Sequence, residues 1–329
     1  RTKEERKGLS AKAIPFQFKM IYTITLNPAL DKTLIVDNLN INQIGRVQRT
    51  LTQAGGKGFN VSRALLRAGI HSKAIGLVGG RTGEVLLEDL AKDGIDVVPI
   101  TINGETRVNQ VFMENASKSV KINDLGPVIS GDEFQVLTRS VDKVASPGDI
   151  WIMSGSLPPG VPSNVYAELS YIIQDRDGKV FLDSSGKAFQ EGLNVAPDWI
   201  KPNLKEAREV FSGGLREVDL LEQFQQLGLK GTLLTMGAKG LMFADAAMVA
   251  HMIVPKLENE NVVGAGDATV AGFIYGVVNE LPSIDCAKWA AAFGVASAHA
   301  SENCFQSFSD VETFYDQIKV EIINEYPSA

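Results

Sequence analysis

Short apolar runs alternate with segments of helical periodicity along most of the chain. A β-rich run at 21–26, stopped by Asn27 and Pro28, predicts a first strand. Further runs predict strands at 73–78, 149–153, 180–182, 199–201 and 232–235. Helical spacing of apolar residues predicts helices after residue 58 and at 82–93, 163–175, 203–211, 267–279, 284–300 and 310–323. This alternation indicates an α/β fold with a mostly parallel sheet covered on both faces.

Two segments, about 32–50 and 96–122, break this rhythm. Both are strand-like, and neither contains a helical pattern of its own. They are therefore predicted to form a small sheet separate from the main one. No internal repeat or low-complexity linker divides the rest, so residues 20–325 are expected to form one domain with these two segments inserted.

Composition and charge narrow the classes of partner. Hydrophobic residues make up 44% of the 329 residues and charged residues 22%, as in ordinary soluble globular proteins. No apolar run approaches the ~20 residues needed to cross a bilayer. The net charge of −7 argues against a broad nucleic-acid surface but permits a local basic pocket for phosphates. We therefore expect neither a membrane nor a nucleic acid as partner.

The cysteines and histidines indicate no cross-link and no zinc site. Only Cys286 and Cys304 are present, which fits a reducing, cytoplasmic compartment. The three histidines, His71, His251 and His299, are scattered without zinc-ligand spacing.

The first 19 residues differ from the rest of the chain. Six basic residues stand against two acidic ones, and Pro15 and Gln17 interrupt the apolar residues, so a signal peptide is not indicated. Met20 directly precedes the first strand pattern. We interpret residues 1–19 as a leader or an added remnant outside the fold, in preference to a functional basic tail.

The most informative glycine turn lies at 261–273. Gly264 and Gly266 permit a tight turn, and Asp267 opens a predicted helix. Free amides at a helix N-terminus attract phosphate, and Asp267 could accept the proton of an attacking hydroxyl. Because Asp is also a favoured helix cap, a purely structural turn explains the spacing about equally well. The small residues after Asp267 shift the balance slightly toward a ligand site.

A second glycine cluster, 55–60, also precedes a helix. It is not a Walker A loop, since Gly58 stands where Ser or Thr is required and the upstream glycine is missing. Neither cluster satisfies Gly-x-Gly-x-x-Gly, because Thr269 occupies the third glycine position after Gly264. The cluster is either a flexible loop or a polar floor where sugar hydroxyls meet the backbone and Asn60.

Residues 203–206 have two compatible interpretations. Asn203 followed by Glu206 matches a capping box, which is the favoured structural interpretation. Lys201, Asn203 and Glu206 could also serve a nucleotide phosphate and its Mg²⁺ through oxygen ligands and water. The stretch 235–240 by itself indicates only a strand end and a glycine turn.

Several charged residues remain ambiguous on the sequence alone. Arg107, Arg46 and Arg49 lie in strand-like segments, where an arginine is either solvated or suited to bidentate phosphate binding. Asp31 follows the first turn and is more often a cap than a ligand.

Taken together, these motifs identify a resemblance. From Met20 to about residue 320 the chain resembles the PfkB (ribokinase-like) sugar kinases, in the branch that contains 1-phosphofructokinase, tagatose-6-phosphate kinase and the minor 6-phosphofructokinase. Any one matching stretch would be weak, but the set is highly specific. The stretches are 25–31, 55–60, 154–160, 183–186, 201–206 and 263–267.

The resemblance implies a ribokinase-like three-layer αβα domain with a small β-sheet lid, which the segments 32–50 and 96–122 match. In the family the lid often forms the contact of a homodimer. The implied reaction is ATP-dependent phosphorylation of a ketohexose phosphate. Fructose 1-phosphate, giving fructose 1,6-bisphosphate, is the first choice of substrate, and tagatose 6-phosphate or fructose 6-phosphate are the alternatives.

The resemblance also implies roles for individual residues. Asp267 would be the catalytic base, beside an anion hole at the turn. The catalytic set is Gly264, Ala265, Gly266 and Asp267. The set implied for the sugar phosphate is Asp31, Gly55, Gly56, Lys57, Asn60, Arg107 and Ser154, with Arg107 on the phosphate. The set implied for ATP is Lys201, Asn203, Glu206, Thr235, Gly237 and Gly240, with Glu206 serving Mg²⁺ through water.

One stretch departs from the family. Many relatives place a Gly-Thr pair near 301–305, and this chain has none, so contacts from this loop to the nucleotide base or to a monovalent ion are not implied. Two other classes of function are open: a non-catalytic sensor of sugar phosphate, and a dinucleotide-dependent oxidoreductase. The candidate base and anion turn count against the first, and the broken glycine fingerprint counts against the second.

Overall fold

The computed structural model of the protein describes residues 20–40, 42–115, 118–257, 263–300 and 304–326. The expectations for residues 1–19 and 301–303 therefore fall outside the described residues, as do the first two positions of the 261–273 stretch. Within the described ranges, no helix has both the length and the apolar character required to span a membrane. Cys286 and Cys304 are both free and buried.

The larger of two sheets has 10 strands. They are β1 (Ile21–Thr25), β4 (Lys73–Val78), β5 (Asp96–Thr101), β8 (Ile150–Ser154), β9 (Lys179–Asp183), β10 (Trp199–Ile200), β11 (Gly231–Thr235), β12 (Leu241–Ala244), β13 (Met248–Ile253) and β14 (Lys319–Glu325). Their spatial order is β14-β13-β12-β11-β10-β9-β8-β1-β4-β5. Pairing is parallel from β5 to β11 and antiparallel from β11 to β14. Every residue of β1 and β8 is buried, as expected for central strands covered on both faces.

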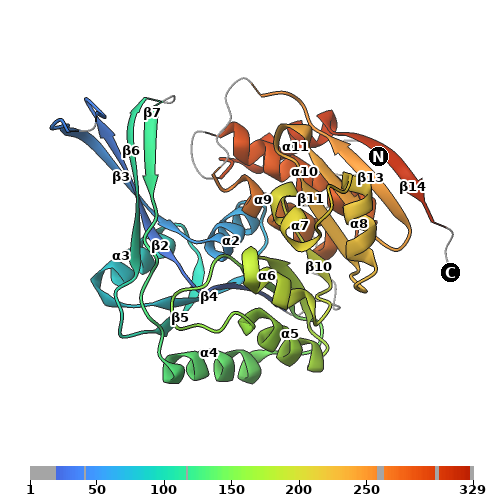
Figure 1. The fold of residues 1–329 in the computed structure, drawn as a ribbon, viewed down its shortest axis with the longest axis horizontal. Coiled ribbons are helices and arrows are strands. Elements are labelled where there is room, and N and C mark those ends of the chain that lie inside the picture. Colours follow the sequence, from blue (N-terminus) through green and yellow to red (C-terminus); the bar gives the residue numbers. More distant parts are fainter. Residues whose placement is uncertain (1–19, 41, 116–117, 258–262, 301–303, 327–329) are drawn as a thin grey trace.

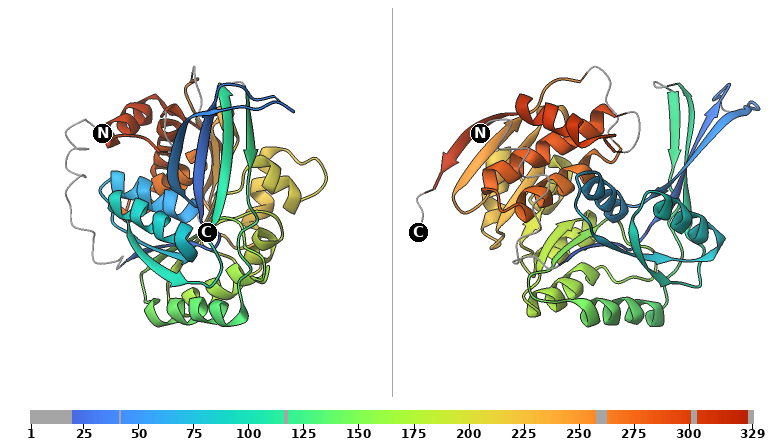
Figure 2. Two further views of the ribbon diagram at one scale, coloured as in Figure 1. Left: turned by 90° about the vertical axis from the view of Figure 1, so that its left-hand side faces the viewer. Right: turned by 180° about the vertical axis from the view of Figure 1, so that it is seen from behind.

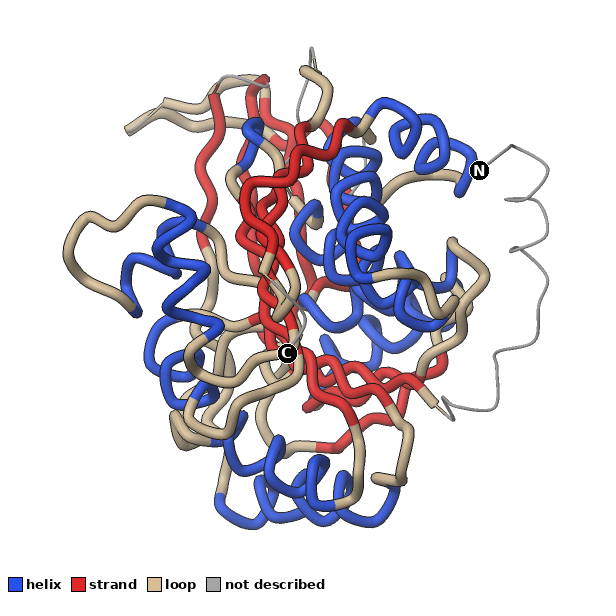
Figure 3. Tube along the Cα trace, turned by 90° about the vertical axis from the view of Figure 1, so that its right-hand side faces the viewer, coloured by secondary structure: helices blue, strands red, loops and turns tan. Residues whose placement is uncertain are grey.

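Helices cover both faces of this sheet, which confirms the three-layer αβα prediction (Figure 3). One layer contains α2 (Lys57–Arg67), α9 (Ala265–Val278), α10 (Ser283–His299) and α11 (Phe308–Gln317). The other contains α4 (Gly131–Val144), α5 (Val165–Asp175), α6 (Gly186–Leu193), α7 (Leu204–Val210) and α8 (Glu217–Gln225). A further helix, α3 (Gly80–Lys92), packs at the base of the second sheet.

The second sheet, which we call the lid, has 4 strands and projects from the body of the protein (Figures 1 and 2). Its strands are β2 (Ala29–Val36), β3 (Val47–Gly55), β6 (Arg107–Asn115) and β7 (Lys118–Ile122), in the order β3-β2-β6-β7. Leu30 and Ala54 at its near end share an apolar cluster with Leu86 and Leu90 of α3. The separate small sheet predicted from the sequence is thus present.

Two boundaries predicted from the sequence are wrong. Residues 96–101 form β5, which pairs in parallel with β4 in the large sheet and is not part of the lid. The α3 crossover between β4 and β5 explains this placement, because it returns the chain to the same sheet. The predicted helix 310–323 ends at Gln317, and residues 319–325 form β14 against β13. Exposed Val320 and Ile322 lie on this edge strand.

The carboxyl ends of the parallel strands place the polar motifs at one edge of the large sheet. Ser154 ends β8, Asp183 ends β9 and Thr235 ends β11. Lys201 directly follows β10. In open α/β sheets this edge is where ligands bind.

Candidate active site

The N-terminus of α9 begins with a residue in the left-handed backbone conformation, and that residue is a glycine. Gly264 is the N-cap with φ 78°, a conformation that favours glycine. Ala265, Gly266 and Asp267 then form the first turn, whose amides have no intrahelical acceptors. The positive end of the helix dipole lies at the same place. The turn therefore offers a binding site for an anion with a carboxylate beside it.

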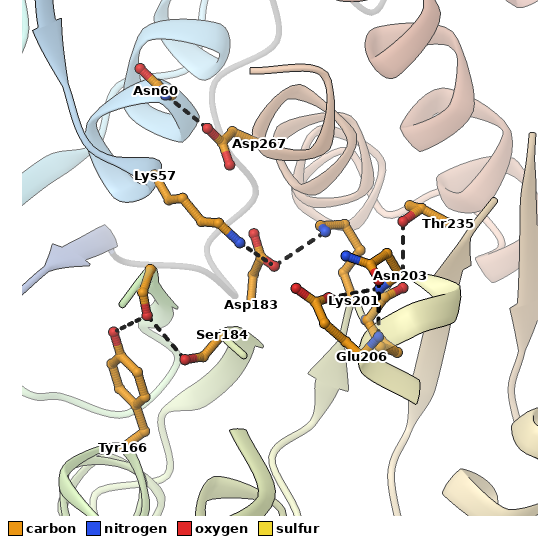
Figure 4. A network of polar contacts seen from close by, with 12 residues as sticks. Lys57, Asn60, Tyr166, Asp183, Ser184, Lys201, Asn203, Glu206, Thr235 and Asp267 are labelled. Carbon is orange, nitrogen blue, oxygen red and sulfur yellow. Dashed lines mark hydrogen bonds and ion pairs between the residues drawn. The ribbon is translucent and has the colours of Figure 1, made fainter. Parts of the chain in front are cut away.

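Asp267 is buried in this turn, with only 6% of its surface exposed. Its Oδ2 accepts a hydrogen bond of 2.8 Å from Nδ2 of Asn60 in α2 (Figure 4). Burial is the main reason that the pKa of Asp267 is raised to about 6. The nearby charge of Asp183 also raises this pKa, and Lys57 lowers it. A carboxylate with this pKa is ionised at neutral pH and basic enough to accept a proton.

The glycine loop, residues 55–60, carries the chain from the lid into α2. Gly56 is the N-cap of α2 with φ 138°, so a side chain is unfavourable there. A Cβ on Gly55 would come within 2.2 Å of Oδ2 of Asp31. Asp31 and the loop backbone therefore lie against each other at the base of the lid.

Asp31 belongs to a polar group at the lid base. Its Oδ1 accepts a hydrogen bond of 2.8 Å from Nδ2 of Asn109, its neighbour across β2 and β6. Burial raises the pKa of Asp31, while Asn109, Lys121 and Arg107 act to lower it. Among the described residues, Oδ1 of Asn109, Nε of Arg107 and Oδ1 of Asn27 are buried without a hydrogen-bond partner. Such atoms suit the hydroxyls of a polar ligand.

Two nitrogens of the Arg107 guanidinium form hydrogen bonds within the protein. Its Nη1 donates to the carbonyl oxygen of Asp124 and its Nη2 to that of Asn27, each at 2.8 Å. The guanidinium thus ties the turn after β1 to the segment that leaves the lid. Its remaining donors can still serve a phosphate, so the predicted role of Arg107 stays a prediction.

Asp183 connects Lys57 of the glycine loop with Lys201, which follows β10. Its Oδ1 lies 3.2 Å from Nζ of Lys57 and 3.1 Å from Nζ of Lys201, and its side chain is fully buried (Figure 4). Burial alone would raise the pKa of Asp183, but Lys201 and Lys57 outweigh it and hold the pKa below its ordinary value. Burial would lower the pKa of Lys57, yet Asp183, Asp267 and Glu206 raise it. Asp183 therefore pairs with both lysines and helps to keep Lys57 in its charged form.

An apolar cavity of about 370 Å³ also borders the α9 turn. Ala265 and Gly266 contribute to its wall. Of the residues predicted to bind ATP, it is lined by Asn203, Thr235, Gly237 and Gly240. Lys201 and Glu206 do not line it. Its size and lining suit the planar, mostly apolar base of a nucleotide.

The capping box predicted at 203–206 is confirmed. Oδ1 of Asn203 accepts from the amide of Glu206 at 2.9 Å, and Oε2 of Glu206 accepts from the amide of Asn203 at 2.8 Å. These bonds begin α7 directly after Lys201. One oxygen of Glu206 is thereby occupied in the capping box, so its predicted part in Mg²⁺ binding rests on the other.

Two arginines lie apart from this group, whereas Ser154 lies beside Asp183 as its partner across β8 and β9. Ser154 is fully buried at the end of β8, and its Oγ has no partner among the described residues. Arg46 and Arg49 are exposed toward the far end of the lid. Because Arg49 is six residues from Gly55, about 20 Å along a strand, it cannot reach the glycine loop of its own chain.

Sequence reasoning missed the role of Asp183, Asn109 and Lys121. Asp183 follows the predicted strand 180–182 directly, and its place at the carboxyl end of a strand was a usable signal. Asn109 and Lys121 gave no such signal, because only the pairing of the lid strands brings them to Asp31. Within the described ranges, no group of three His, Cys, Asp or Glu side chains is arranged to hold a metal ion.

Comparison with known proteins agrees with this geometry. The family model described as pfkB family carbohydrate kinase matches residues 25–306. A curated 1-phosphofructokinase of Bacillus subtilis is 31% identical over 309 residues, which cover 92% of this chain and 99% of the relative. A tagatose-6-phosphate kinase of Staphylococcus epidermidis is 30% identical over 308 residues, again covering 92% and 99%.

Solved structures share the fold as well. A structure of phosphofructokinase-2 from Escherichia coli in complex with fructose-6-phosphate matches with a TM-score of 0.84 at 27% identity. The match covers 91% of this chain and 99% of that one. The likeness therefore includes the lid as well as the large sheet.

Proposed function

The chain belongs to the pfkB family of carbohydrate kinases, and from this premise we propose that it transfers the γ-phosphoryl group of ATP to a hydroxyl of a ketohexose phosphate. Fructose 1-phosphate is the first candidate, and the product would be fructose 1,6-bisphosphate. The names of the relatives support this choice, and the tagatose-6-phosphate kinase among them keeps tagatose 6-phosphate as the alternative.

One observation carries the proposal: Asp267 lies between two candidate binding regions. On one side it is hydrogen-bonded to Asn60 of the glycine loop. On the other, the residues directly before it, Ala265 and Gly266, line the apolar cavity. A sugar hydroxyl at the loop and a nucleotide in the cavity would therefore meet at the amides of the α9 turn.

In this mechanism the protein supplies a proton acceptor and fixed positive charge. Asp267 takes the proton of the attacking hydroxyl, and the amides of the α9 turn stabilise negative charge on the transferred group. Lys57 and Lys201, both held by Asp183, place two further positive charges beside the turn. Positioning and electrostatics supply most of the rate enhancement in phosphoryl transfer.

The residues present fit Mg²⁺ bound with ATP. Mg²⁺ keeps several waters and uses one or two carboxylates together with substrate phosphates. Glu206 and Asp183 would hold it, since Oδ2 of Asp183 is buried without a partner among the described residues. When bound, it would neutralise charge on the phosphates of ATP.

A substrate panel tests the proposed function. The purified protein is assayed with ATP, Mg²⁺ and each of fructose 1-phosphate, fructose 6-phosphate and tagatose 6-phosphate, and kcat/KM is ranked. We expect ADP release with at least one of them and the highest kcat/KM with fructose 1-phosphate. A higher value with tagatose 6-phosphate would select the alternative, and no release with any of the three would reject kinase function in favour of a sensor.

The pKa of Asp267 predicts the pH dependence. The base must be ionised to accept a proton, so kcat should fall as the pH drops through about 6. Measuring kcat between pH 5 and 8.5 at saturating substrates checks this. A half-maximal rate near pH 4 would show that Asp267 has its ordinary pKa or is not the base.

We further propose that the lid joins two copies of the chain. Val120 and Ile122 lie on one face of the lid and Leu51 on the other, and all three are 44–56% exposed; exposed apolar residues on a projecting sheet indicate a contact surface. The mass of the protein in solution should therefore be twice 35.5 kDa. Replacing Leu51 by Lys should shift that mass toward one chain, whereas a 35.5 kDa particle for the unaltered protein would contradict the proposal.

A further inference from the structure

Arg63 is a charged residue with no role in the site described so far. It lies in α2 and is 2% exposed, although a buried charge is costly unless it is fully paired. Its guanidinium donates to three different acceptors. Nε donates to Oδ2 of Asp93 at 2.7 Å, Nη1 to Oδ1 of Asn60 at 2.8 Å, and Nη2 to the carbonyl oxygen of Ala54 at 3.1 Å.

The contact with Asn60 has a chemical consequence. The two ends of an asparagine amide have nearly the same shape, but one accepts hydrogen bonds and the other donates them. A guanidinium can only donate. Arg63 therefore holds the oxygen of Asn60 on its own side, and the NH₂ group is left to face Asp267.

We infer that Arg63 is a positioning residue that selects which end of the Asn60 amide faces the carboxylate of Asp267. The inference rests on the proposed function, in which the ionised form of Asp267 is the base. A donor to a carboxylate favours its ionised form, whereas the amide oxygen would favour the protonated form. Arg63 thus keeps Asp267 ready to accept a proton without touching the substrate.

The same guanidinium also fixes the junction between lid and body. Ala54 is the residue before the glycine loop, and its carbonyl oxygen is held by Arg63 while its amide donates to Oδ2 of Asp89 at 2.7 Å. Both polar backbone atoms of Ala54 are thereby bound to side chains, the carbonyl oxygen to Arg63 of α2 and the amide to Asp89 of α3. Arg63 connects the place where the lid meets α2 with the residue that contacts Asp267.

Two substitutions test whether Arg63 fixes the orientation of the Asn60 amide or only provides a long polar side chain. Lysine, like arginine, only donates, so in R63K the Asn60 amide should keep its orientation. Glutamine both donates and accepts, so in R63Q the amide can turn when Asp267 is protonated. In a plot of kcat against pH, the fall on the acidic side (the acidic limb) should move up by about 0.5–1 pH unit in R63Q and by far less in R63K.

Arg67 provides a matched control. It lies one turn further along α2, and its Nη1 donates to the carbonyl oxygen of Phe305 at 2.6 Å, away from Asp267. R67Q should leave the acidic limb where it is. The charged groups that face Asp267 from other elements, namely Lys57, Asp183 and Lys201, are unchanged in all these variants.

A double-mutant cycle with N60A excludes a simple effect of losing a positive charge. If Arg63 acts through the Asn60 amide, R63Q should add no shift of the limb in the N60A background. A shift that persists without Asn60, an equal shift in R63K and R63Q, or an unshifted limb in R63Q would each overturn the inference.

The inference can also be judged separately from kinase activity. The pKa of Asp267 can be followed by the ¹³C shift of its carboxyl carbon, identified by its loss in D267N. R63Q should raise this pKa and R63K should not. Failure of the unaltered protein to phosphorylate any sugar phosphate would reject the proposed function, while this titration would still decide the role of Arg63.

Discussion

Replacing Asp267 by Asn should lower kcat roughly 10²–10⁴-fold while ATP binding stays close to normal. The amide has the size of the carboxylate but cannot accept the proton, and the cavity residues are untouched. The measurement is ADP release at saturating substrates, together with an equilibrium titration with ATP. Near-normal turnover would remove Asp267 from the mechanism.

Asp285 offers a matched control for this variant. It occupies the third position of α10, the position that Asp267 occupies in α9. Both carboxylates therefore interact with a helix N-terminus, but Asp285 contributes to none of the contacts of the site. D285N should keep kcat within about twofold, since surface changes away from functional contacts have small effects.

The D267N variant should not be less stable than the unaltered protein at neutral pH. The pKa of Asp267 is about 6 in the folded protein against 3.8 ordinarily, so its protonated form is favoured by folding. The stability that this protonation contributes is full below pH 4 and is lost as the pH rises through 6. Relative to the unaltered protein, D267N should therefore gain stability over this range, by about 3 kcal/mol at most. Thermal unfolding at pH 4 and pH 7.5 would show it.

Replacing Asp183 by Asn should cost about 3–5 kcal/mol of stability and most of the activity. The fully buried carboxylate pairs with Lys57 and Lys201, and its loss leaves two ammonium groups without their counter-ion. Lys201 is only 5% exposed, so it cannot recover its hydration. Chemical unfolding and ADP release measure the two effects. A D183N protein with unchanged stability would contradict this account.

Two further variants sharpen that experiment. D183N with K201M removes one of the unpaired charges, so it should regain part of the stability without regaining activity. Asp198 is the matched control, because it too is nearly buried and pairs with two lysines, Lys179 and Lys230. Those lysines are 38% and 55% exposed, and Asp198 lies at the amino end of β10. D198N should therefore lose less stability and keep its kcat.

Local sequence signals predicted the elements that local chemistry builds. The α9 turn needed a glycine at a positive φ and a short acidic residue in the first turn, and both could be read from 264–267. The capping box of Asn203 and Glu206 is likewise complete within four residues. Strands 149–153 and 180–182 were recognisable because strands buried on both faces must be apolar throughout.

Other assignments depended on partners distant in the sequence. Residues 319–325 carry apolar residues that fit a helix or a strand equally well, and only the free edge of β13 makes them a strand. Residues 96–101 resembled the lid segments around them, and only pairing with β4 places them in the large sheet. A short apolar run does not reveal which strand it will pair with.

By itself, the sequence determined the fold family, the alternation of strands and helices, and the glycine turns with their candidate base, since each of these is encoded within a few neighbouring residues. Only the tertiary structure decided how the charges of the site are balanced. Asn60 and Asp267 are 207 positions apart, and Asp183 reaches Lys57 across 126. Contacts of this kind arise where α2 and α9 pack together beside the strand ends at one edge of the large sheet, so the burial that sets the pKa of Asp267 and the network around Arg63 follow from packing.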